Sequence, residues 1–283
     1  MPFDAVEAIK VAALFVFFLS IGVELGHEIR HGSLAKPRQA IVPILAACGG
    51  MLVPVLIYSA VNLGRPTAAG WGVPMSTDVA FALAVLAAFG RFLPKQIRVF
   101  LLTVAVVDDS LTILIIAIFF ASSFHPLSIA SITAVALGLF LPHGKRIARW
   151  LNPLANFVAL PVFALVSLWL SIQDFTGTLS GSTITLGVIL AMVVGKPIGV
   201  LGTTWLVTKT GLGKLAGEIK WPDLLAIGPL FGICFTVALM MSELAFGANA
   251  QWHSIANLSV VIGSLASAAI AILTLQIRKR SHV

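Results

Sequence analysis

Four charged side chains stand inside apolar stretches of the sequence. Asp108 and Asp109 interrupt the run VAVVDDSLTILII, and Lys196 interrupts VVGKPIGV. Asp78 lies at the centre of a third apolar stretch. An ionised group near the bilayer centre costs roughly 2.5–3.5 kcal/mol on insertion scales, so such groups must pair or face a water-filled cavity. A structural Lys–Asp pair would leave two carboxylates unexplained, so we expect an ion or proton pathway.

Asp108 and Asp109 are neighbours on one predicted helix. Adjacent helical side chains diverge by about 100°, so the two carboxylates need not share a partner. One of them can face a cavity while the other faces Lys196. The same divergence argues against an aspartic protease dyad, in which carboxylates from two separate elements converge on one proton.

The composition places the chain in a membrane. Of its 283 residues, 59% are hydrophobic and only 10% are charged, and the mean hydropathy is +1.03. A soluble domain carries about 25% charged residues, which argues against a soluble enzyme or a nucleic-acid-binding domain. Cys48 and Cys234 both lie in apolar stretches, so we expect neither a disulfide nor a zinc cluster. The chain is predicted to be an all-α integral membrane protein.

Nine membrane-spanning segments are predicted from apolar runs, because a helix that crosses a bilayer needs about 20 mostly apolar residues. The fifth is short enough to be tilted or re-entrant. No soluble domain fits between the spans, so residues 1–283 are predicted to form a single transmembrane domain. The predicted spans are 6–24, 39–62, 66–90, 97–120, 126–142, 151–172, 183–207, 222–246 and 255–277.

The basic residues predict an orientation. Fifteen of the 18 lysines and arginines fall on alternate connections, beginning after the first span. Cytoplasmic loops carry an excess of basic residues, so the N-terminus is predicted outside and the C-terminus in the cytoplasm. Cytoplasmic loops and the anionic membrane surface also account for the formal charge of +7, so no nucleic-acid partner is expected.

Two of the predicted spans contain breaks at mid-membrane depth. In the third span, Pro74 stops one half-helix and a new one is predicted to start near Asp78. In the eighth span, a Gly-Pro break precedes a restart near Thr236. Broken spans in corresponding places of two blocks indicate a transporter binding site. The blocks, 39–120 and 183–277, would form an inverted three-helix repeat.

At these residues the chain resembles the NhaA-type sodium/proton antiporters. The resemblance implies a helical bundle in which two discontinuous helices cross at the midplane. It also implies exchange of Na⁺ or Li⁺ for protons, without a cofactor, across the bacterial inner membrane. The matching stretches are IGVELGHEIRHGSLAKPRQAIVP (21–43), STDVAFALAVLAAFG (76–90), FLLTVAVVDDSLTILIIAIFF (100–120), VVGKPIGV (193–200) and GICFTVALMMSELAFG (232–247).

The resemblance implies a role for each of the central charges. Asp109 would be the principal cation ligand, and Asp108 would exchange a proton or a salt bridge with Lys196. Protons and Na⁺ would then compete for the same carboxylates, which couples their movements. Release and uptake of a proton by Lys196 would allow more than one proton per Na⁺ and hence electrogenic exchange.

Four further residues receive roles from the same resemblance. Asp78 and Thr77 would lie where the two broken helices cross. Glu24 and Glu28 would lie near a cytoplasmic funnel. These residues would therefore line or support the route of the ion.

The chain departs from the family in length. The family has twelve spans, whereas nine are predicted here, and residues 121–140 replace nearly three helices with about one. Nothing in the chain matches the family's first helix or the β-hairpin that helps to form its dimer. The resemblance therefore implies a complete ion-binding core in a shortened scaffold, and it leaves a homodimer open.

Two alternative functions remain at this point. His27-Glu28-Ile29-Arg30-His31 fits H-E-x-x-H, in which two histidines bind zinc and the glutamate acts as a base. An intramembrane zinc metalloprotease is thus the best enzyme hypothesis, although it does not explain the charges at the midplane. The second alternative is a degenerate homologue that has lost transport.

Overall fold

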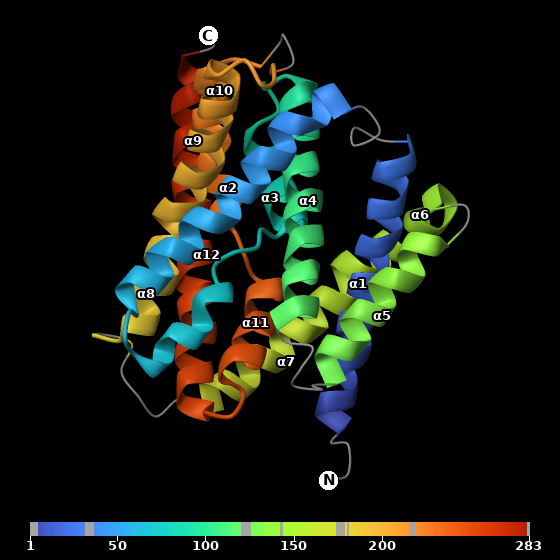
Figure 1. The fold of residues 1–283 in the computed structure, drawn as a ribbon, viewed down its shortest axis with the longest axis vertical. Coiled ribbons are helices and arrows are strands. Elements are labelled where there is room, and N and C mark those ends of the chain that lie inside the picture. The colour runs from blue at the N-terminus through green and yellow to red at the C-terminus, as the bar shows by residue number, and fades with distance from the viewer. Residues whose placement is uncertain are drawn as a thin grey trace.

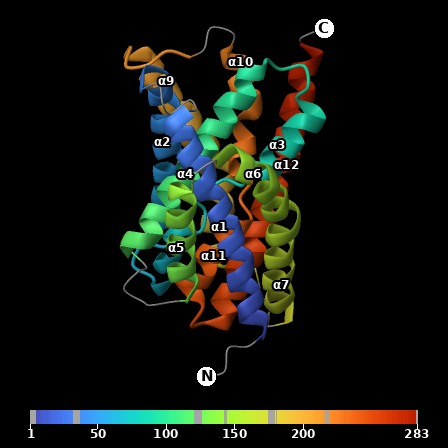
Figure 2. The same ribbon diagram turned by 90° about the vertical axis from the view of Figure 1, so that its right-hand side faces the viewer.

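The computed structural model describes residues 5–31, 37–119, 126–141, 144–173, 179, 181–215 and 219–281. Every regular element in these ranges is a helix, which confirms the predicted all-α membrane bundle. Figure 1 shows the helices arranged with most of their axes along the long direction of the molecule. In Figure 2, α1 begins at one end of the bundle and α12 ends at the other.

One group of helices packs around the first. In Figure 1, α1, α5 and α6 form the right-hand part of the molecule, and α7 continues from α6. A π-helical turn, η4 (Ala155–Ala159), joins α6 to α7, so the helical path begins seven residues before the predicted span 151–172. The members of this group are α1 (Ala5–His31), α5 (Pro126–Phe140), α6 (Gly144–Leu154) and α7 (Leu160–Gln173).

A second pair of long helices packs closely through glycines. α2 (Pro37–Val61) lies against the continuous helical path formed by α8 (Thr183–Leu190), η5 (Ala191–Gly195) and α9 (Lys196–Lys209). At their crossing, a Cβ atom added to Gly199 would lie 2.8 Å from the carbonyl carbon of Gly49. The two backbones therefore approach to a distance that only glycine permits. The π-helical turn η5 ends directly before Lys196.

Two helical paths are broken in the middle, as predicted. The first runs through η2 (Pro66–Gly72) and α3 (Val79–Phe89), with six non-helical residues between them. The second runs through α10 (Trp221–Ile227), η6 (Gly228–Gly232) and α11 (Thr236–Phe246), and it bends by 43° at the break. The restarts fall at Val79 and Thr236, next to the predicted positions.

Two unbroken helices complete the frame around these paths. α4 (Lys95–Phe119) carries the aspartate pair, and α12 (Ala250–Arg280) packs against both halves of the second broken path. Three of the described helical segments are long and apolar enough to cross a membrane alone, and the bent path 221–246 makes a fourth. Those three are Ile41–Val61, Thr183–Lys209 and Ala250–Arg280. The count of nine spans remains a prediction.

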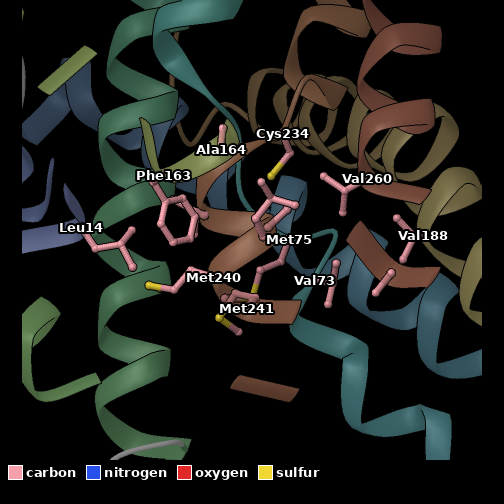
Figure 3. Packing of buried hydrophobic residues seen from close by; sticks show 14 of the residues in the cluster. Leu14, Val73, Met75, Phe163, Ala164, Val188, Cys234, Met240, Met241 and Val260 are labelled. Atoms are coloured by element: carbon pink, nitrogen blue, oxygen red, sulfur yellow. The ribbon is translucent and has the colours of Figure 1, made fainter. Parts of the chain in front are cut away.

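The buried hydrophobic residues form two clusters that lie at opposite ends of the long helices. On α12, Val260 belongs to one cluster and Ala271 to the other. On α2, Tyr58 belongs to the cluster of Val260, and Ala46 belongs to the cluster of Ala271. The polar residues of the two breaks lie between these clusters, at the middle of the bundle. Figure 3 shows part of the cluster that contains Val260.

Candidate functional site

The two breaks are hydrogen-bonded to each other. The backbone N–H of Asp78 donates to the carbonyl oxygen of Ile233 at 2.7 Å. The Thr77 hydroxyl donates to the carbonyl oxygen of Phe231 at 2.9 Å. Breaks in two helices expose backbone groups that need partners in an apolar interior. Here each break supplies partners for the other.

Asp78 lies between the starts of two half-helices. It is the residue before α3, and its Oδ2 atom accepts a hydrogen bond of 3.0 Å from Thr236, the first residue of α11. A helix N-terminus carries a partial positive charge of about half a unit. The carboxylate therefore lies where two such partial charges can stabilise it. The Asp78 side chain is buried.

Lys196 connects the aspartate pair to the crossing. Its Nζ atom lies 2.7 Å from Oδ2 of Asp108 and 2.9 Å from Oγ1 of Thr77. Both members of the ion pair are 1% exposed. Since the Thr77 hydroxyl donates to Phe231, its oxygen is available to accept from the ammonium group. One buried cation thus joins α9, α4 and the first broken path.

Asp109 points into a different environment from Asp108. It lines a cavity of about 90 Å³ between α1, α4 and the two breaks. The cavity can hold several water molecules, because one needs about 10–15 Å³ by this measure. The other polar residues that line it are Ser20, Ser76, Thr77, Asp78 and Cys234. The adjacent carboxylates therefore diverge, one toward the cavity and one toward the lysine.

The oxygen atoms around the cavity suit a hard cation. Carboxylate, hydroxyl and carbonyl oxygens are the preferred ligands of such ions. Two carboxylates, those of Asp78 and Asp109, line the cavity from different elements. A space lined by two carboxylates in this way can bind either a small cation or protons.

Some cavity residues were not predicted as site residues. Ser20 of α1 and Cys234 of the second break both line the cavity, and the Cys234 thiol lies 2.9 Å from the Ser76 hydroxyl. Thr236 binds Asp78 directly. The sequence does predict that a new half-helix begins near Thr236. Ser20 gave no signal, because a single serine in an apolar helix has no distinctive spacing.

Other predicted residues lie beyond what the structure can place. The side chains of Glu24, Glu28 and His31 are outside the described residues, although α1 carries their backbone to its end at His31. The funnel role of the two glutamates therefore stays a prediction. Among the described side chains, no group of three or more His, Cys, Asp or Glu could hold a metal ion.

Interlocked broken helices beside a carboxylate-lined cavity define the class of secondary transporters with discontinuous helices. The sequence matches the family described as Na⁺/H⁺ antiporter 1 over residues 3–145 and 130–275. The chain belongs to this family of membrane transporters and is not an enzyme. Family membership gives no support to the metalloprotease or to the degenerate homologue.

Several bacterial relatives named Na(+)/H(+) antiporter NhaA are similar to most of the chain. The Frankia casuarinae protein is 36% identical, over 95% of this chain and 74% of the relative. The Streptomyces antibioticus protein is 37% identical, over 95% of this chain and 67% of the relative. Na(+)/H(+) antiporter NhaA 1 of Kineococcus radiotolerans is 37% identical, over 95% of this chain and 76% of the relative.

These alignments also show internal shortening. The match to the Frankia protein extends over 328 positions, whereas the chain has 283 residues, so at least 45 aligned positions lack a residue here. The two family matches overlap at 130–145, which spans the end of α5 and the beginning of α6. The overlap begins within residues 121–140, and the reduction of the family's middle helices there stays a prediction.

Proposed function

We propose that this protein exchanges Na⁺ or Li⁺ for protons across the bacterial inner membrane. The observation that carries the proposal is the divergence of Asp108 and Asp109. Asp109 lines the cavity, while the neighbouring Asp108 holds the buried Lys196. Relatives with 36–37% identity that are named Na(+)/H(+) antiporters support the choice of ions.

Asp109 is the principal cation ligand in this proposal. Na⁺ prefers hard oxygen ligands, and Asp109 faces the cavity with Thr77 and Asp78 close to it. Burial without compensation opposes the charged form of a carboxylate. The empty site therefore takes up either a cation or a proton, and the two compete for one position.

In this proposal, Lys196 explains why more than one proton is exchanged for each Na⁺. When Na⁺ binds Asp109 and Asp108 together, Asp109 releases its proton, and Lys196, which loses its 2.7 Å partner, releases a second one. When Na⁺ leaves, Asp109 and Lys196 each take up one proton. Two protons then replace one Na⁺, so the loaded states differ by one charge and the exchange is electrogenic.

The crossing positions these groups. Asp78 stabilises the starts of α3 and α11, and Thr77 holds Lys196 against the second broken path. We further propose that 39–120 and 183–277 form an inverted repeat around this crossing. The basic residues on alternate connections support an external N-terminus and a cytoplasmic C-terminus.

Reconstituted protein tests the proposal directly. Wild-type proteoliposomes with an imposed pH gradient should dissipate it when Na⁺ or Li⁺ is added, and K⁺ should have little effect. Asp109→Asn, which keeps the side-chain volume and removes the charge, should abolish the response. Asp223→Asn controls for the loss of a buried, paired carboxylate outside the cavity, and the folded fraction of this variant should keep the Na⁺-dependent response. Full Na⁺-dependent dissipation in Asp109→Asn would refute the assignment.

A further inference from the structure

A second polar cluster lies away from the cavity, toward the end of the bundle where α1 begins. Lys10 of α1 and Glu243 of α11 form an ion pair, with 2.8 Å between Nζ and Oε2. Their side chains are 8% and 20% exposed. The Asp108–Lys196 mechanism uses neither residue, and both lie on helices that also border the cavity.

The ion pair lies on the extension of the cavity along both helices. On α1, Lys10 precedes the cavity residue Phe17 by seven positions, which is two turns or about 10 Å. On α11, Glu243 follows Thr236 by the same interval. α1 and α11 both extend from the site toward the same end of the bundle, and the Lys10–Glu243 ion pair joins them two turns away.

The helical turns between the cavity and the ion pair carry buried apolar side chains, which we call the plug. Leu14 lies between Lys10 and Phe17 on α1, and Met240 lies between Thr236 and Glu243 on α11. With Phe163 of α7, they belong to one cluster of packed hydrophobic residues, and all three are at most 1% exposed. Figure 3 shows these three side chains within that cluster. A hydrated cation cannot pass this plug while the helices stay together.

Glu243 also lies close to polar residues of α12 and α7. His253 of α12 lies 3.4 Å from Oε2 of Glu243, and Asn257 lies 3.1 Å from the His253 ring. Asn257 also donates to Ser171 of α7 at 2.8 Å. Glu243 therefore lies beside polar residues of α12 and α7, and its ion pair with Lys10 joins α11 to α1.

We infer that the Lys10–Glu243 ion pair and the plug of Leu14, Phe163 and Met240 form the gate that closes the cavity on the face where α1 begins. This inference rests on the proposed function, because a gate matters only if an ion leaves through that face. Opening requires α1 to separate from α11, which breaks the ion pair and unpacks the plug. Lys10 and Glu243 are then positioning residues that set the balance between closed and open states.

The native Cys234 thiol reports on this gate, because it lines the cavity and is 1% exposed. The chain has two cysteines, so Cys48→Ala leaves Cys234 as the only thiol. A membrane-impermeant cationic methanethiosulfonate is applied to sealed vesicles from each face, and an N-terminal epitope identifies the face where α1 begins. Lys10→Met and Glu243→Gln should each accelerate labelling from that face about tenfold and leave the opposite face unchanged.

Two matched variants sharpen the test. Lys10→Arg keeps the charge and should label like the parent, and the reversed pair Lys10→Glu/Glu243→Lys should return labelling toward the parental rate. Complete labelling of protein unfolded in SDS shows that Cys234 can react. Unchanged labelling of both folded single variants then overturns the gate. Equal acceleration from both faces also overturns it, because that result indicates general loosening.

The labelling result is independent of the exchange assay. Thiol modification measures access to Cys234 and needs no turnover, so a wild-type protein without Na⁺/H⁺ exchange refutes the proposed function alone. A crosslink provides a second measurement. Lys10→Cys/Glu243→Cys, joined by a short bis-methanethiosulfonate in a background without native cysteines, should stop exchange until a reductant is added. Full exchange in the crosslinked protein contradicts the gate.

Discussion

The hydroxyl oxygen of Thr77 lies 2.9 Å from Nζ of Lys196, in an interior where both side chains are almost completely buried. Hydrogen bonds to charged groups contribute about 1.5–3 kcal/mol. Thr77→Val removes this acceptor and the donor to Phe231 while it preserves volume. We expect the initial rate of Na⁺-dependent pH dissipation to fall at least about tenfold. Thr77→Ser keeps the hydroxyl and should retain most of the rate; a Val variant as fast as wild type would contradict this role.

The buried ion pair predicts that stability and transport respond differently to a double substitution. Breaking a buried pair by removal of one partner costs about 3–5 kcal/mol, whereas removal of both is often nearly neutral. Asp108→Asn and Lys196→Met should each lower the Tm in detergent by roughly 10 °C. The double variant should recover most of the Tm but no exchange. If the double variant is as unstable as the sum of the single variants, the two side chains are not coupled.

The glycine contact between α2 and α9 predicts a stability difference between two nearby alanine substitutions. A Cβ on Gly199 would meet Gly50 Cα at 3.0 Å, whereas nothing lies within 4 Å of a Cβ on Gly202. Gly199→Ala must push the helices apart, at a cost of about 1–3 kcal/mol. Gly202→Ala should be neutral or slightly stabilising, since alanine favours a helix by about 1 kcal/mol over glycine. The Tm values of both variants, measured by thermal unfolding in the same detergent, test this difference. Equal Tm values would contradict the close packing.

The far end of α12 predicts a structural role for one of its three basic residues, Arg278. Arg278 donates from Nε to Oδ1 of Asp223 at 2.7 Å, and Asp223 is 1% exposed in the first turn of α10. Arg278→Gln removes the cation that faces this buried carboxylate, so we expect a clear fall in Tm. Arg280→Gln, at an exposed position of the same helix, should change the Tm little. A similar fall in both variants would indicate a general effect of charge.

The breaks could be predicted from the sequence because their causes are local. Proline removes a backbone donor and disfavours a continuing helix, and Asp78, a residue type that favours the start of a helix, follows Pro74 by four positions. The divergence of Asp108 and Asp109 follows from helical geometry in the same way. These signals need no knowledge of which elements pack together, and the structure confirms both.

The contacts between distant segments could not be predicted. Lys10 and Glu243 are 233 positions apart, and no pattern in the sequence links them. Ser76 and Cys234 are 158 positions apart, and no sequence pattern pairs the two stretches that contain them. The π-helical turn before Lys196 also left no trace, because its residues, AMVVG, fit an ordinary helix. Such features depend on tertiary packing.

The hydrogen bonds between the two breaks have a mechanical consequence. Asp78 bonds to Ile233 and Thr236, and Thr77 bonds to Phe231, so a few residues of each path are fastened together at several points. Because these hydrogen bonds join the two broken paths at their breaks, a tilt of one path must also move the other. In the proposed function, the two breaks would therefore move as one unit, and the surface that slides would be their boundary with α1.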